Sequence, residues 1–202
     1  MTQAKHWPLL PSQILPVLSI LILAILAYLF EDSLISLLIY NRDQIIEHEY
    51  WRLITGHFFH TNLNHLLLNI AGLVLLWSLH GQYYQSKNYF LLFLFSALFV
   101  TIGLFNFSPE LIQYVGLSGI LHGVFIWGAL MDIRDKLKSG YLLLLGIIIK
   151  VTHEQIYGAG TDISELIEAN VAVDAHLWGA VSGVVFFGLT LCFTKTENNK
   201  KR

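Results

Sequence analysis

The stretch GLSGILHG at residues 116–123 places a serine between two glycines, four residues ahead of a histidine. A serine at the start of a helix lies beside free backbone N–H groups and the positive end of the helix dipole, and both favour a developing negative charge. Ser118 is therefore a candidate nucleophile, with Gly116 and Gly119 as candidate residues of a substrate pocket. The alternative is that these small residues serve only close packing between membrane helices.

Two histidines compete for the role of general base to this serine. His176 opens the stretch HLWGAVSG, in which Gly179 and Gly183 share its helical face and allow another helix to approach closely. His122 is four residues from the serine on the same helix face, so spacing alone does not exclude it. It lies a turn deeper, where proton exchange with water is harder, so we prefer His176 as the base and treat His122 as a pocket residue. The alternative for His176 is a histidine near the membrane interface that bonds to a neighbouring carbonyl group.

A second group of polar residues precedes and opens another apolar stretch. His65 and Asn69 share a helix face, so the asparagine amide could donate to an oxyanion or bond to a neighbouring helix. His57, His60 and His65 together would match the three protein ligands of a catalytic zinc site. The HExxH motif is absent and those turns carry no acidic general base, so we expect neither a metal nor another cofactor.

The composition indicates that these residues lie in a membrane protein. The chain has 202 residues, of which 55% are hydrophobic and 13% charged, against about 25% charged in soluble domains. The net charge of −2 and the lack of a basic patch give no sign of a nucleic-acid partner. The single cysteine, Cys192, excludes a disulfide framework. We expect an all-α membrane protein whose residues 1–202 form one domain embedded in the lipid bilayer.

Six stretches have about the length and apolar content that a bilayer-spanning helix needs. The fifth is expected to be short or tilted, because its apolar run ends at Lys150. The acidic linker 31–60 is long enough to contain short helices of its own. The predicted spans are residues 14–30, 61–80, 89–107, 115–131, 140–157 and 171–193.

The placement of lysine and arginine predicts that both termini are cytoplasmic. With the N-terminus inside, nine basic residues fall on inner segments and three on outer segments. The inner set is Lys5, Lys87, Arg134, Lys136, Lys138, Lys195, Lys200, Lys201 and Arg202, and the outer set is Arg42, Arg52 and Lys150.

This orientation brings the candidate residues to one depth. The second, fourth and sixth spans all begin at the outer face, so His65, Ser118 and His176 lie on the same side of the membrane. A nucleophile, a base and oxyanion donors at one depth favour acyl-transfer chemistry. A proton-coupled transporter would need polar groups along a path through the bilayer and an embedded carboxylate, and the sequence offers neither.

The same residues resemble the rhomboid family of intramembrane serine proteases. The stretch EYWRLITGHFFHTNLNHLLLN resembles the rhomboid sequence leading into the second helix, and GLSG and AHLWGAVSG resemble the motifs of the fourth and sixth helices. The resemblance spans residues 49–186 and implies a rhomboid-like bundle of six transmembrane helices. The segment 31–60 would be a half-submerged loop, and the fifth helix with the segment after it would admit the substrate laterally.

The resemblance also implies a role for each matched residue. Ser118 would be the nucleophile and His176 its base, without a third, acidic member. The oxyanion hole would be formed by Asn69, His65 and the backbone N–H of Ser118.

One departure narrows the resemblance to a branch of the family. Many bacterial rhomboids have an aromatic residue, commonly tyrosine, where this chain has His122. GLSGILHG is similar to the rhombosortase branch, which is associated with substrates carrying a C-terminal Gly-Gly tail, a membrane helix and a basic end. This implies cleavage of membrane-anchored proteins at a bacterial inner membrane, in a site that opens toward the periplasm. The alternatives are a generic rhomboid protease for single-pass membrane proteins and a non-catalytic rhomboid-like binding protein.

Overall fold

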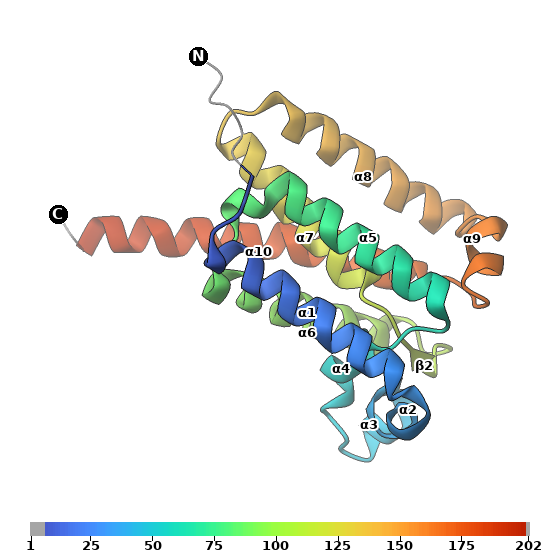
Figure 1. Ribbon diagram of the computed structural model, residues 1–202. Coiled ribbons are helices and arrows are strands. Elements are labelled where there is room, and N and C mark those ends of the chain that lie inside the picture. Colours follow the sequence, from blue (N-terminus) through green and yellow to red (C-terminus); the bar gives the residue numbers. More distant parts are fainter. Residues whose placement is uncertain (1–6, 201–202) are drawn as a thin grey trace.

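The computed structural model describes residues 7–200, with side chains as far as Cys192, and shows a bundle of long helices (Figure 1). Each of the six predicted helices is present. They are α1 (Pro11–Leu29), α5 (Leu63–His80), α6 (Ser86–Phe107), α7 (Ser118–Arg134), α8 (Lys138–Tyr157) and α10 (Val173–Lys200).

Short elements connect these helices, and the linker 31–60 contains several of them, as predicted. Two strands of two residues each, β1 and β2, form an antiparallel pair with Tyr40 opposite Tyr114, which the sequence did not predict. The short elements are α2 (Glu31–Leu38), β1 (Tyr40–Asn41), α3 (Arg42–Ile46), α4 (Arg52–Thr55), η1 (Gly56–Phe58), η2 (Gly81–Tyr83), β2 (Gln113–Tyr114) and α9 (Thr161–Leu166).

Arg52 holds the linker in a fixed path toward the start of α7. Its buried guanidinium donates to the carbonyl oxygens of Ile39 at 3.0 Å and Ser36 at 2.9 Å. A buried charge with satisfied donors is costly to displace. Since Ile39 directly precedes β1, and β1 pairs with β2, this contact fixes the segment that leads into GLSG.

Local chemistry explains where three of the helices begin or end. Asn62 caps α5, its side chain accepting from the His65 backbone N–H at 2.9 Å. The predicted helix from residue 115 begins only at Ser118, because Gly116 has a φ of 115°, a conformation incompatible with a helix. The fifth predicted helix, expected to be short or tilted, is present at full length as α8. Helix α8 has 20 residues and continues through Lys150, whose ammonium pairs with Glu154 one turn later at 2.7 Å.

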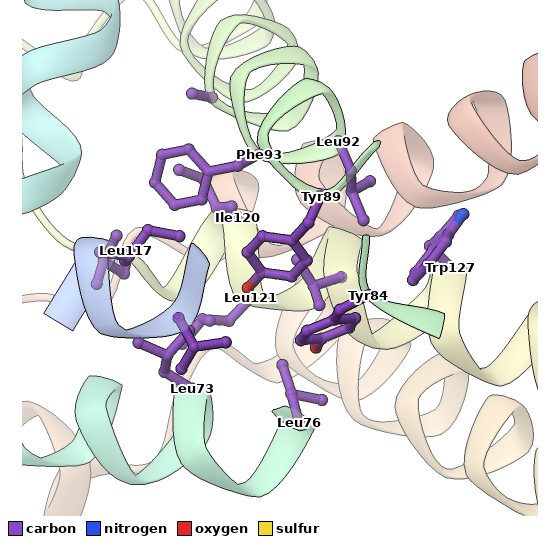
Figure 2. Packing of buried hydrophobic residues seen from close by; sticks show 14 of the residues in the cluster. Leu73, Leu76, Tyr84, Tyr89, Leu92, Phe93, Leu117, Ile120, Leu121 and Trp127 are labelled. Atoms are coloured by element: carbon purple, nitrogen blue, oxygen red, sulfur yellow. The ribbon is translucent and has the colours of Figure 1, made fainter. Parts of the chain in front are cut away.

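Helix α7 is the centre of the bundle, and most of its residues are buried. Side chains along its whole length, from Ile120 to Met131, pack in a cluster with side chains of α1, α5 and α6. Figure 2 shows the rings of Tyr84 and Tyr89 next to each other in this cluster, their centroids 4.2 Å apart, with Trp127 of α7 nearby. Aromatic packing of this kind fixes the neighbouring helices relative to α7.

The outer surface of the bundle is apolar. Large side chains such as Leu75 on α5, Phe90 on α6 and Leu142 on α8 are exposed, and extensive exposed apolar surface indicates a membrane environment. Among the residues that the structure describes, four helices are long and apolar enough to cross a membrane. They are Pro11–Leu29, Leu63–Tyr83, Ser86–Phe107 and Val173–Cys192.

The two ends of the bundle differ in what they contain. The starts of α5, α7 and α10 and the end of α8 lie together at one end, beside α9 and β2 (Figure 1). Helix α1 starts and α10 finishes at the opposite end. Of the residues that predict the orientation, Lys5, Lys201 and Arg202, and the side chains of Lys195 and Lys200, lie outside the described residues.

Candidate active site

Ser118 and His176 meet at the end of the bundle where α7 and α10 begin. The hydroxyl of Ser118 lies 2.9 Å from Nε2 of His176, although the residues are 58 positions apart in the chain. That distance is suited to proton transfer from a hydroxyl to an imidazole. Ser118 is half-buried and His176 is 6% exposed. The pair is therefore shielded from bulk water without being sealed.

Four glycines bring α10 close enough to α7 for this contact. Gly179 lies against Gly119, and a β-carbon at Gly179 would overlap the Gly119 carbonyl oxygen. Gly183 lies in the same way against the carbonyl oxygen of Gly123. Small residues allow such backbone approach between membrane helices. The small face predicted on α10 is its contact with α7, and it sets the distance between the serine and the histidine.

The structure gives Gly116 and Gly119 places other than the predicted substrate pocket. Neither lines the two cavities that reach Ser118. Gly116 turns the chain with its positive φ, and a β-carbon there would lie 2.8 Å from Nε2 of His65. Gly119 is covered by α10. Both glycines act on the site by letting other groups approach it.

His122 lies beside the pair but its nitrogens face other partners. Its Nδ1 donates to the Ser118 carbonyl oxygen at 2.7 Å, and its Nε2 lies 3.1 Å from the ammonium of Lys150. Its ring stacks on His176, with centroids 4.1 Å apart and planes inclined by 14°. With both nitrogens engaged, His122 is poorly placed to take the serine proton. It lines an apolar cavity next to Ser118.

Helix α8 brings two charged residues to the far side of His176. One carboxylate oxygen of Glu154 lies 2.8 Å from Nδ1 of His176, and the other accepts from Lys150 at 2.7 Å. The resemblance implies a base without an acidic partner, whereas in this structure the Glu154 carboxylate contacts Nδ1 of His176. The Glu154 side chain is 12% exposed. Its four-residue spacing from Lys150 was visible in the sequence, but nothing showed that this face turns toward α10.

His65 and Asn69, the predicted oxyanion donors, both lie in the first turns of α5 and are buried. They line the same cavity as Ser118. The Asn69 amide nitrogen donates to the His65 carbonyl oxygen at 2.9 Å. A side-chain amide has two N–H groups, so one remains for another acceptor.

Two cavities meet at Ser118. One, of about 370 Å³, lies beside α2 and β2 and has Glu31 and Tyr114 in its wall. The other, of about 360 Å³, is mostly apolar and lies between α5 and α8, with Leu68 and Ile147 on its two sides. The serine can therefore be reached from a more polar side and from an apolar one.

His57 and His60 support the site from outside the long helices. Burial lowers the pKa of His57 to about 4, although nearby carbonyl oxygens of Ala97 and Gly116 act to raise it. Burial and the neighbouring His65 lower the pKa of His60 to about 3. Both are neutral at pH 7. The His57 nitrogens lie 3.1 and 3.3 Å from those two carbonyl oxygens, and the neutral ring donates to one of them.

Among the described side chains, a different group has the composition of a metal site. The ligand atoms of His122, Glu154 and His176 lie within 4.8 Å of one another. Lys150, however, donates to both Glu154 and His122 within this group. The Lys150 ammonium therefore already provides a positive charge in this group. The three residues fit a hydrogen-bonded network around His176 better than a cation site.

Comparison with known proteins bears on the same part of the chain. A family model described as the Rhomboid domain matches residues 47–192. That range includes Ser118, Glu154 and His176, and it begins just before α4. No curated protein matches the chain in sequence.

Proposed function

Because the chain belongs to the rhomboid family, whose members are generally intramembrane serine proteases, we propose that it is an intramembrane serine endopeptidase. The observation that carries this proposal is the 2.9 Å contact between the Ser118 hydroxyl and Nε2 of His176. Acyl transfer requires at least a nucleophile and a base in direct hydrogen-bond contact beside a cavity.

In the proposed reaction, His176 takes the hydroxyl proton of Ser118 as Oγ attacks the scissile carbonyl carbon. The resulting oxyanion accepts hydrogen bonds from the Ser118 backbone N–H, Asn69 and His65. The tetrahedral intermediate collapses by breaking the C–N bond, and the imidazolium gives its proton to the leaving amine. Water then attacks the acyl-enzyme with His176 again as base, which frees the new carboxyl terminus and restores the serine.

We further propose that residues 1–202 form one membrane domain with six spans and both termini in the cytoplasm. The excess of basic residues on inner segments supports this orientation. Six crossings also agree with α1 starting and α10 finishing at the same end of the bundle (Figure 1). Ser118 would then lie near the outer face, which in a bacterial inner membrane is the periplasmic face.

The substrate we propose is a membrane-anchored protein with a C-terminal Gly-Gly tail, as in the rhombosortase branch. The similarity of GLSGILHG to that branch supports this choice. The apolar cavity between α5 and α8 suits an apolar helix ending beside Ser118. Glycines in the tail carry no side chain, which allows the substrate backbone to approach Ser118 closely.

Labelling by a serine-directed fluorophosphonate tests the nucleophile directly. We expect the purified protein to be labelled, because Ser118 Oγ can displace fluoride from the phosphorus with His176 as base. Ser118→Ala should lose the label completely, whereas Ser164→Ala, a control on α9, should keep it. In-gel fluorescence measures both. Equal labelling of the wild type and Ser118→Ala would show that another residue reacts and would overturn the assignment.

Competition between two substrates tests the proposed branch. We expect kcat/KM for a Gly-Gly tail substrate to exceed that for a generic single-pass rhomboid substrate by about tenfold or more. The measurement uses both substrates in the same proteoliposomes. Replacing both tail glycines with valine should remove the preference. Equal rates for the two substrates would leave a rhomboid protease and rule out the narrower specificity.

A further inference from the structure

Five hydrogen bonds form a closed ring that begins and ends on Ser118. His176 contacts Ser118, Glu154 and His122 directly, and Lys150 is linked to it through Glu154. Glu154 and Lys150 both come from α8. In order around the ring, the contacts are Ser118 Oγ to His176 Nε2 at 2.9 Å, His176 Nδ1 to Glu154 at 2.8 Å, Glu154 to Lys150 at 2.7 Å, Lys150 to His122 Nε2 at 3.1 Å, and His122 Nδ1 to the Ser118 carbonyl oxygen at 2.7 Å.

The partners in this ring determine where each proton lies. A carbonyl oxygen can only accept, so His122 carries its proton on Nδ1 and accepts from the Lys150 ammonium at Nε2. A carboxylate also only accepts, so His176 carries its proton on Nδ1. Nε2 of His176 is then the free base that faces the serine hydroxyl. Every donor in the ring meets one acceptor without conflict.

We propose that Glu154 is a positioning residue that holds His176 in the reactive tautomer and orientation, and that Lys150 holds the Glu154 carboxylate in place. The inference rests on the proposed function, because it concerns the base of that same reaction. The carboxylate gives the imidazole one fixed orientation and faces the positive charge that forms on it during proton transfer. Without a partner at Nδ1, the ring could carry its proton on Nε2 and could no longer accept from the serine.

The charges around His176 are balanced for this role. His65 faces it from α5, His122 from α7, and Lys150 and Glu154 from α8. The lysine and glutamate form a neutral pair, and His122 stacks on His176 as a neutral ring because it accepts from the lysine. Among the described side chains, Glu154 is thus the one negative charge in contact with the imidazolium that forms. Both α8 residues also line the apolar cavity, so the helix that borders the proposed substrate site also positions the base.

The test measures fluorophosphonate labelling rates and tail cleavage for substitutions at Glu154. Glu154→Leu, which removes the acceptor, should lower both rates by about 10²-fold or more. In Glu154→Gln the amide oxygen accepts from Lys150 and the amide NH2 faces Nδ1 of His176 as a donor, which favours the unreactive tautomer, so its loss should be at least as large. The thermal unfolding midpoint should stay close to the wild type. Glu165→Gln, which removes an exposed acidic residue on α9, is the matched control and should change nothing.

The pH profile separates positioning from a merely structural contact. Loss of the carboxylate makes protonation of His176 less favourable, so the acid limb of the Glu154→Gln labelling profile should move to lower pH. A contact that only pins α8 to α10 would lower the unfolding midpoint and leave the profile unmoved. Wild-type rates and an unmoved profile in Glu154→Leu would overturn the proposal. If the wild type is labelled but cleaves no tail, the proposed substrate fails while the role of Glu154 can still be measured.

Discussion

Ser118→Ala and His176→Ala are each expected to lower the cleavage rate of a tail-bearing substrate by about 10³-fold or more. Each substitution removes one side of a single proton transfer across the 2.9 Å contact between the hydroxyl and Nε2. Since the two residues act as one unit, the double variant should be no slower than either single variant. The measurement is cleavage in proteoliposomes, with the thermal unfolding midpoint showing that the variants still fold.

His122 provides the matched comparison, because it is the other histidine at the serine and stacks on His176. We expect His122→Ala to reduce the rate less than His176→Ala does, since its nitrogens face the Ser118 carbonyl oxygen and Lys150 rather than the hydroxyl. Full activity in His176→Ala together with lost activity in His122→Ala would show that the base has been misassigned.

The convergence of Ser118 and His176 could be predicted because three kinds of local information agree. Apolar length predicts the helices, charge placement predicts their direction across the membrane, and that direction predicts the depth of each polar residue. The glycines of α10 then mark the face that approaches another helix. These signals depend on short-range sequence patterns, and the structure has the corresponding helices with their starts at one end of the bundle (Figure 1).

Glu154 could not be assigned in the same way, because its role depends on how α8 is rotated against α10. Periodicity shows that Lys150 and Glu154 share a face. A pair of opposite charges four residues apart is, however, as typical of a helix end exposed to solvent as it is of an active site. The β1–β2 pair could not be predicted from the sequence either, because strands of two residues carry no periodic pattern. The later start of α7 follows from the positive φ of Gly116, a glycine that His65 of another helix also approaches closely, and neither feature is part of a local sequence pattern.

The contact between Gly179 and Gly119 should be the most sensitive packing position for activity outside the reacting groups. In Gly179→Ala, the new β-carbon would overlap the Gly119 carbonyl oxygen, and backbone on both sides leaves no flexible side chain to move away. The helices must separate, which moves His176 on α10 away from Ser118 on α7. A displacement of about 1 Å in a reacting pair can cost about 10²-fold in rate. We therefore expect cleavage to fall by about that factor and the unfolding midpoint to drop, since overpacking costs about 1–3 kcal/mol.

Gly188 is the matched control for this substitution, because it lies on the same helix and has nothing near the position of a new β-carbon. Gly188→Ala should leave the cleavage rate at the wild-type value and leave the unfolding midpoint the same or slightly higher. Comparing Gly179→Ala with Gly188→Ala separates the effect of close approach between the helices from the effect of helix propensity. Alanine favours a helix over glycine by about 1 kcal/mol at both positions. If Gly179→Ala matched Gly188→Ala in rate and stability, the glycines would be incidental. The distance between Ser118 and His176 would then have to be set elsewhere, with the α8 residues around Glu154 as the remaining contact to the base.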